Sequence, residues 1–137
     1  MFEWGCGNST IWWSRHVRRV VAVEDNAEWF NMVRERVPEN VDLRFAQDHD
    51  AYVSALESAG ERFDLIVVDG SHRTDCVDRL SQVAPTTARS SFSITRTHRS
   101  FLSAVQALKR AGWHRLDLYG MIACFAYKNC TSIYLKD

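Results

Sequence analysis

Residues 63–73 read FDLIVVDGSHR, and this stretch decides the fold class of the 137-residue chain. Its apolar run at 63–68 predicts the strongest strand of the sequence. Polar residues, among them Asp69 and His72, follow the run at once, and a helix is predicted over about 74–83. A strand that leads directly into a helix is typical of α/β proteins with a parallel sheet.

The same alternation recurs on the N-terminal side of this stretch. VVAVE at 20–24 predicts a strand buried on both faces, and VDLRFA at 41–46 predicts another. Residues 1–4 lead into a glycine turn and are predicted to form the first strand, at the centre of the sheet. Helices are expected near 10–17, 26–37 and 50–59. These βαβ units predict a mostly parallel sheet covered by helices on both faces.

The last third of the chain is less regular. A helix is predicted over 100–111, followed by strands at 114–120 and 131–137. Between Pro85 and this helix, residues 86–100 contain eight Ser or Thr, three Arg and no acidic residue. A buried fifth strand belongs here, and Arg89 and Arg96 could not lie unpaired at its buried positions without a large cost. If residues 86–97 are read out of frame, we expect them to pair poorly or to be exposed, and to leave the edge of the fourth strand partly uncovered.

Composition excludes several classes of protein. Apolar residues make up 46% and charged residues 25%, which are ordinary globular values, and no apolar run is long enough to span a membrane. The N-terminus does not resemble a signal peptide, so we expect a cytoplasmic protein with reduced cysteines. The net charge is zero, which gives no electrostatic reason to expect nucleic acid or membrane as partners.

The charge is divided unevenly along the chain. Residues 1–70 carry 13 acidic and 7 basic side chains, whereas residues 71–137 carry 4 acidic and 10 basic ones. Two oppositely charged faces of one domain would explain this division, and so would an anionic ligand bound by the second half.

Ligands of parallel α/β sheets bind beyond the carboxyl ends of the strands. The residues expected at these ends are Gly5, Cys6 and Gly7; Glu24 and Asp25; Gln47 and Asp48; and Asp69 to His72. A glycine turn before a helix allows a ligand to approach the backbone. Glu24 could accept both hydroxyls of a ribose, or it could be an acidic residue favoured at a helix start.

The other carboxylates at this edge have two interpretations as well. Asp48 could contact a ligand or cap the following helix. Asp69 ends an apolar strand, where a carboxylate needs a partner such as a metal, a ligand amine or His72. His72 suits general-base chemistry, although a surface histidine at a helix start would look the same.

These motifs resemble those of class I S-adenosylmethionine-dependent methyltransferases over nearly the whole chain. FEWGCGNST (2–10) is similar to the family's first motif, and VVAVEDNAEWF (20–30) and FAQDHDAY (45–52) are similar to the second and third. FDLIVVDGSHR resembles the fourth-strand motif of a small-molecule methyltransferase subgroup, and TSIYLKD (131–137) resembles the antiparallel last strand. The resemblance implies a Rossmann-like, three-layer α/β sandwich.

The resemblance also implies a function. We expect methyl transfer from S-adenosylmethionine to a small-molecule acceptor, with Glu24 on the ribose, Asp48 on the adenine side, and Asp69 and His72 deprotonating the acceptor. The expected cofactor-binding residues are Glu3, Gly5, Cys6, Gly7, Glu24, Asp25, Gln47, Asp48 and Asp69.

Two departures from the family pattern leave alternatives open. Residues 1–137 are expected to form a single domain without the family's usual N-terminal helices. The Asp-Asn pair that usually ends the fifth strand is missing, so a metal site that would combine it with Asp69 is not expected. One alternative is an inactive remnant that at most binds a nucleoside cofactor or a partner. A second is an NAD-dependent oxidoreductase, which is disfavoured because Thr10 replaces the third glycine of G-x-G-x-x-G.

Overall fold

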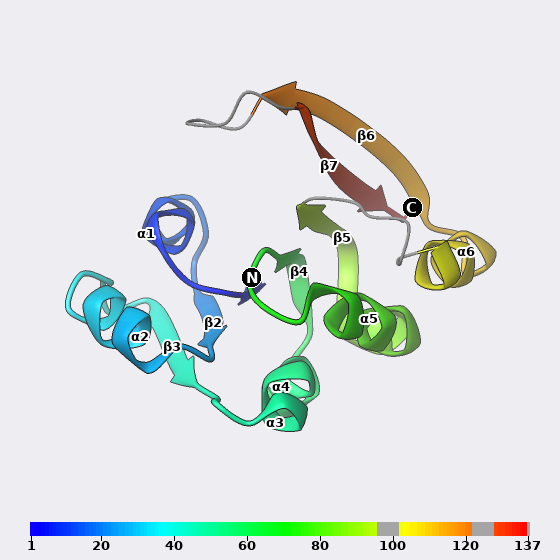
Figure 1. Cartoon of the computed structure of the whole chain (residues 1–137). Helices are drawn as coiled ribbons and strands as arrows, with labels where there is room; N and C mark the ends of the chain where they lie inside the picture. Colours follow the sequence, from blue (N-terminus) through cyan, green and yellow to red (C-terminus); the bar gives the residue numbers. More distant parts are fainter. Residues whose placement is uncertain (96–101, 122–127, 137) are drawn as a thin grey trace.

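The computed structural model describes residues 1–95, 102–121 and 128–136, with 84–95 and 128–129 described by their backbone alone. The described residues form one seven-stranded sheet in the order β3-β2-β1-β4-β5-β7-β6 (Figure 1). The strands are β1 (Phe2–Trp4), β2 (Val20–Glu24), β3 (Val41–Phe45), β4 (Phe63–Val68), β5 (Ala88–Thr95), β6 (His114–Met121) and β7 (Lys128–Leu135).

The direction of the strands confirms the predicted fold class. β1 is short and fully buried, and it pairs in parallel with β2 on one side and β4 on the other. β3 and β5 extend this parallel sheet on its two sides, whereas β7 is antiparallel to both β5 and β6. The first strand is therefore central, and the last strand is antiparallel, as the sequence predicted.

Helices cover the sheet in two layers (Figure 1). The helices are α1 (Asn8–Ser14), α2 (Ala27–Arg34), α3 (His49–Val53), α4 (Ala55–Ser58), α5 (Arg73–Thr87) and α6 (Leu102–Arg110). α1 and α2 pack on one face, while α3 to α6 pack on the other. Alternate residues of the strands supply the two cores: Phe2 and Trp4 face the α5 side, and Val20 and Ala22 face the α1 side.

The expectation for the fifth strand is wrong in one respect. β5 forms within the segment predicted to pair poorly, and it pairs with β4 along one edge and with β7 along the other. The edge of β4 is therefore covered. Extended backbone pairs through its own N–H and C=O groups, so a segment rich in Ser and Thr can still complete a sheet. Residues 96–100 of the segment lie outside the described residues.

Two helix boundaries also differ from those predicted. α5 continues through Pro85 to Thr87, because proline removes one helical hydrogen bond but has a φ that suits a helix. The single helix expected over 50–59 is divided into α3 and α4 at Ser54. The Ser54 hydroxyl donates to the Asp50 carbonyl at 2.6 Å, an interaction that is known to bend helices.

Membrane insertion through a helix has no support in the described part of the chain, where each helix is too short or too polar to cross a bilayer.

Candidate functional site

Two glycine-containing turns meet at the carboxyl ends of β1 and β4. Gly5 has a φ of +91°, which favours glycine, and its N–H donates to the Val23 carbonyl at 2.8 Å. A Cβ on Gly5 would lie 2.7 Å from the Gly70 Cα, and a Cβ on Gly70 would lie 2.7 Å from the Gly5 nitrogen. Neither turn can carry a side chain at this point, so the two turns pack directly against each other.

A buried carboxylate fixes the turn after β1. Glu3 is 1% exposed, and its oxygens accept hydrogen bonds from the hydroxyls of Ser9 at 2.8 Å and Thr10 at 2.7 Å. The Thr10 hydroxyl in turn accepts the Gly7 N–H at 2.9 Å. Burial raises the pKa of Glu3 to about 7, although the two hydroxyls oppose this shift. Thr10, which departs from the dinucleotide pattern, thus orders the turn through Glu3.

Glu24 joins the ends of β1 and β2. It is buried, and its two carboxylate oxygens accept the backbone N–H groups of Cys6 at 3.1 Å and Asn26 at 3.0 Å. Each oxygen keeps a further lone pair, so the carboxylate is held in a fixed orientation and can still accept ligand hydroxyls. The thiol of Cys6 stays protonated, because burial and then the Glu24 charge raise its pKa.

The residues after β4 separate into two groups. Asp69 forms an ion pair of 2.9 Å with Arg73, whose guanidinium also donates to the Asp69 and Gly70 carbonyls. His72 faces Asp25 instead, with 3.5 Å between Nε2 and Oδ2, and the Ser71 hydroxyl donates to the same carboxylate at 3.1 Å. The partner of Asp69 that the sequence left open is thus a basic residue one helical turn away.

A cavity of about 310 Å³ lies at these strand ends. Five of the predicted cofactor-binding residues line it, namely Glu3, Gly5, Cys6, Glu24 and Asp69. The other lining residues are Ser9, Trp29, Gly70, Ser71 and Arg73.

Sequence reasoning missed Trp29. Its spacing of four residues from Val33 predicts a place on the apolar face of α2. Its side chain is instead 43% exposed, and its indole N–H donates to the Cys6 carbonyl at 2.6 Å. The ring also lies 3.6 Å from the position of a Cβ on Gly7. The one signal in the sequence that could have identified Trp29 was its indole N–H, which usually donates a hydrogen bond to a partner.

Four predicted cofactor residues are outside the lining of this cavity. Asp48 caps α3 by accepting the Ala51 N–H at 2.9 Å, which confirms the capping interpretation without excluding a ligand contact. Gln47 is exposed beside it. Gly7 lies in the turn directly before α1, and the Asp25 carboxylate contacts Ser71 and His72.

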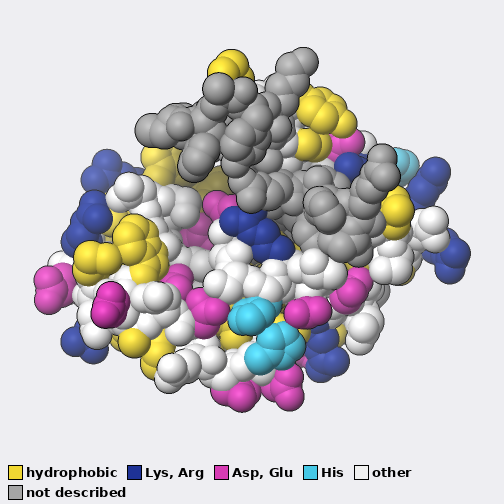
Figure 2. Space-filling model, viewed as in Figure 1, with side chains coloured by type: hydrophobic (Ala, Val, Ile, Leu, Met, Phe, Trp, Pro, Cys, Tyr) yellow, Lys and Arg dark blue, Asp and Glu magenta, His cyan; other side chains and the backbone are white. Residues whose placement is uncertain are grey.

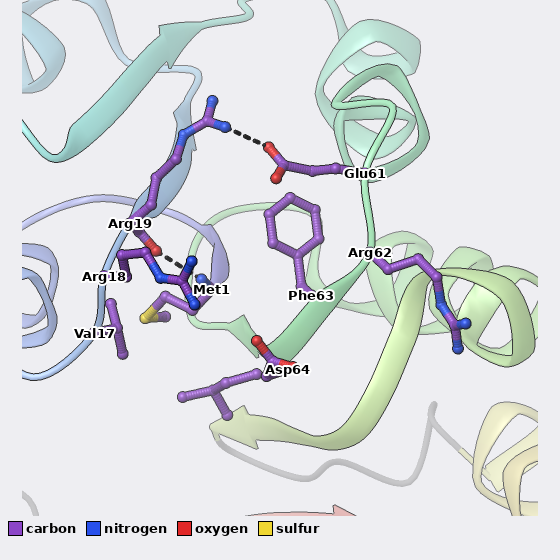
Figure 3. Close-up of a pocket in the computed structure, with 9 residues that line it drawn as sticks. Met1, Val17, Arg18, Arg19, Glu61, Arg62, Phe63 and Asp64 are labelled. Atoms are coloured by element: carbon purple, nitrogen blue, oxygen red, sulfur yellow. Dashed lines mark hydrogen bonds and ion pairs between the residues drawn. The ribbon is translucent and has the colours of Figure 1, made fainter.

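A second cavity, larger than the one at the carboxyl ends, lies at the opposite edge of the sheet. It measures about 530 Å³ and surrounds the start of β1, the start of β4 and the residues before β2 (Figure 3). Arg19 crosses it to form an ion pair of 2.8 Å with Glu61, and the Met1 amino group donates to the Arg19 carbonyl at 2.7 Å. Mixed charges that pair with each other at the amino ends of the strands do not form a nucleotide site.

Comparison with known proteins agrees with this fold. The sequence model described as a methyltransferase domain matches residues 2–94, so the chain belongs to this methyltransferase domain family. Its fold is the one of class I methyltransferases. A comparison with curated proteins gives no match.

Solved methyltransferases share this fold at low sequence identity. The O-methyltransferase TomG from Streptomyces achromogenes, solved in complex with S-adenosylmethionine, has a TM-score of 0.71 and 16% identity over 99% of this chain and 72% of its own. The N-methyltransferase NodS from Bradyrhizobium japonicum has a TM-score of 0.63 and 15% identity over 98% and 84%. Sp1610 of Streptococcus pneumoniae, described as a putative tRNA methyltransferase, has a TM-score of 0.65 and 10% identity over 98% and 62%.

Proposed function

We propose that residues 1–137 form one methyltransferase domain that binds S-adenosylmethionine at the carboxyl ends of β1, β2 and β4 and transfers its methyl group to a small-molecule acceptor. One observation carries this proposal: the Glu24 carboxylate is held by two backbone amides and lines a cavity together with Gly5 and Gly70. The NAD-dependent alternative has no comparable support, because the family match is to methyltransferases.

The residues present fit this cofactor. Gly5 and Gly70 let the two turns pack against each other, and both line the cavity, where glycine allows a ligand to approach the backbone. The lone pairs that Glu24 keeps suit the two hydroxyls of a ribose. We propose that Asp48 and the exposed Gln47, at the end of β3, contact the adenine side of the cofactor. Gly7 and Asp25, in the turns after β1 and β2, are proposed as further cofactor-binding residues.

When bound, the cofactor supplies a sulfonium methyl group that an acceptor nucleophile attacks in line. The protein's main contribution is to hold the two reactants in contact and to exclude water. Asp69 lines the cavity, whereas the ring of His72 faces Asp25 and His49. We therefore favour Asp69 over His72 as the group that contacts the acceptor and takes its proton.

A small acceptor fits the charge of this edge better than a nucleic acid does. The described strand ends carry four acidic residues, Glu24, Asp25, Asp48 and Asp69. The positive charge of Arg73 is already paired with Asp69. Acidic side chains around a site repel phosphate groups, which nucleic-acid binding has to neutralise.

The test is calorimetric titration with S-adenosylhomocysteine, the product of the cofactor, followed by a methyl-transfer assay. We expect Glu24→Ala to weaken binding about 10- to 150-fold, the equivalent of about 1.5–3 kcal/mol for a charged hydrogen bond. Glu28→Ala, at an exposed glutamate in the first turn of α2, is the matched control and should change binding less than threefold or so.

Because Glu24 also orders two loop amides, each variant is compared with the parent chain by thermal unfolding, and the near-isosteric Glu24→Gln is tested beside Glu24→Ala. Equal losses for Glu24 and Glu28 variants would refute the ribose role. No binding by the parent chain would refute the proposed function. Binding without turnover for a panel of small acceptors would favour the inactive remnant.

A further inference from the structure

Beside the cofactor cavity, three separate segments bring two histidines and an aspartate together. Among the described residues, His49, His72 and Asp75 each offer one ligand atom within 4.8 Å of the others. His49 begins α3, His72 ends the turn after β4, and Asp75 lies in the first turn of α5. The two imidazole rings meet edge to face, with centroids 4.7 Å apart, and His49 Nε2 lies 3.0 Å from Asp75 Oδ2.

Carboxylates surround the imidazoles as they do around metal-bound histidines. The other ring nitrogen of His49, Nδ1, lies 2.9 Å from Asp50 Oδ1, and His72 Nε2 lies 3.5 Å from Asp25 Oδ2. Metal-bound histidines usually donate their second N–H to a carboxylate or a carbonyl, which fixes the tautomer and the ring plane. Figure 2 shows two neighbouring histidine side chains with acidic side chains on both sides.

The backbone at His72 is also unusual. Its φ is +47°, the only positive value among described residues other than glycine. This conformation costs about 1–2 kcal/mol for a residue with a Cβ. It turns the chain between β4 and α5 so that the His72 ring lies against His49 and Tyr52.

We propose that His49, His72 and Asp75 bind a divalent transition-metal ion, with Zn²⁺ as the representative. Two imidazoles and one carboxylate suit zinc and its neighbours, whereas Mg²⁺ and Ca²⁺ prefer oxygen ligands throughout. Three protein ligands leave a fourth position open to water. The site is exposed enough to load from solution, since its three side chains are 40–52% exposed.

This site is distinct from the metal site that would combine Asp69 with an Asp-Asn pair at the end of the fifth strand, where this sequence has no such pair. A metal ion at His72 would attach the turn that carries Asp69 to both α3 and α5. The consequence is a more rigid rim beside the proposed cofactor cavity. The inference does not depend on the proposed function, because it concerns metal binding by the chain alone.

A protonated His49 between two aspartates is the alternative explanation of the cluster. Asp50 first, and then Asp75, raise the pKa of His49 through hydrogen bonds. An imidazolium would hold these carboxylates by charge and would have no affinity for a cation. Metal binding measured above neutral pH separates the two explanations, because a neutral imidazole is required for ligation.

The experiment titrates the full chain, kept reduced at about pH 8, with Zn²⁺ by calorimetry and with Co²⁺ by visible absorption. We expect one Zn²⁺ per chain and Co²⁺ bands without a thiolate charge-transfer band. His49→Ala and His72→Ala should each weaken binding at least about 10- to 100-fold. His16→Ala, at an exposed histidine two residues after α1, is the matched control and should leave the affinity unchanged.

Thermal unfolding provides a second readout. Saturating Zn²⁺ should raise the Tm of the parent chain and of His16→Ala, and it should not raise that of His49→Ala. If an alanine variant is unfolded without metal, Asp75→Asn replaces it in this test, because asparagine keeps the size of the side chain. The proposal is overturned if the parent chain binds no Zn²⁺, if His16→Ala loses as much affinity as His49→Ala, or if Co²⁺ reports thiolate ligands.

Discussion

Glu3→Gln should change how the stability of the chain depends on pH. The Glu3 carboxyl group is 1% exposed, and burial raises its pKa from 4.5 to about 7. Below pH 4.5 the group is protonated in both folded and unfolded chains, so it carries no penalty. Between 4.5 and 7 the unfolded chain ionises first, and the free energy of unfolding falls as pH rises. Above about 7 the penalty is complete.

The size of this effect follows from the two pKa values. A difference from 4.5 to about 7 corresponds to roughly 3 kcal/mol. The glutamine variant keeps the size of the side chain and cannot ionise, so it lacks this penalty at every pH. A constant offset from altered hydrogen bonds to Ser9 and Thr10 is expected, and only the change with pH is diagnostic.

The assay is urea unfolding followed by tryptophan fluorescence at pH 5, 6, 7 and 8. We expect the free energy of unfolding of Glu3→Gln, relative to the parent chain, to rise by about 2–3 kcal/mol from pH 5 to pH 8. Glu28→Gln, at an exposed glutamate, should give a difference that is constant from pH 6 to pH 8. A Glu3→Gln difference that is also independent of pH would refute the reasoning from burial.

Two further substitutions test the turns of the site. Gly70→Ala should destabilise the chain by about 1–3 kcal/mol, because the added Cβ would overlap backbone 2.7 Å away. Gly120→Ala, where the added Cβ would have no atom within 4 Å, should cost less than about 0.5 kcal/mol. Urea unfolding measures the stability of both variants. Thr10→Val should cost about 1–3 kcal/mol, since the Gly7 N–H and a buried carboxylate lose their hydroxyl partner. Thr10→Ser, which keeps the hydroxyl, should lose less, and a similar loss in both variants would contradict the hydrogen-bond account.

The sequence predicted the fold because its strands are short apolar runs that end in polar residues. VVAVE and FDLIVV are short runs rich in β-branched residues, which is typical of buried strands, and each is followed by a helix. The order of the strands was not predicted beyond the central place of the first strand, since periodicity does not specify which strands pair. The fifth strand was misjudged because β5 pairs through its backbone, which composition does not report.

The candidate site was predictable only as a set of strand ends. Glu24 and the glycine turn were identified from their positions, because parallel strands bring their carboxyl ends to one edge. The partners of these residues were not predictable: the contacts of Trp29 with Cys6 and of His49 with Asp75 join segments 23 and 26 residues apart. Such contacts depend on how helices pack on the sheet, which no local pattern specifies.

The most direct test of the central claim maps S-adenosylhomocysteine binding onto the backbone amides of the ¹⁵N-labelled chain by NMR. The account predicts that the largest shift changes fall on Cys6, Gly7, Asn26 and Ser71, at the carboxyl ends of β1, β2 and β4. Shift changes centred on the cavity around Arg19 at the opposite edge, or none at saturating ligand, would contradict it.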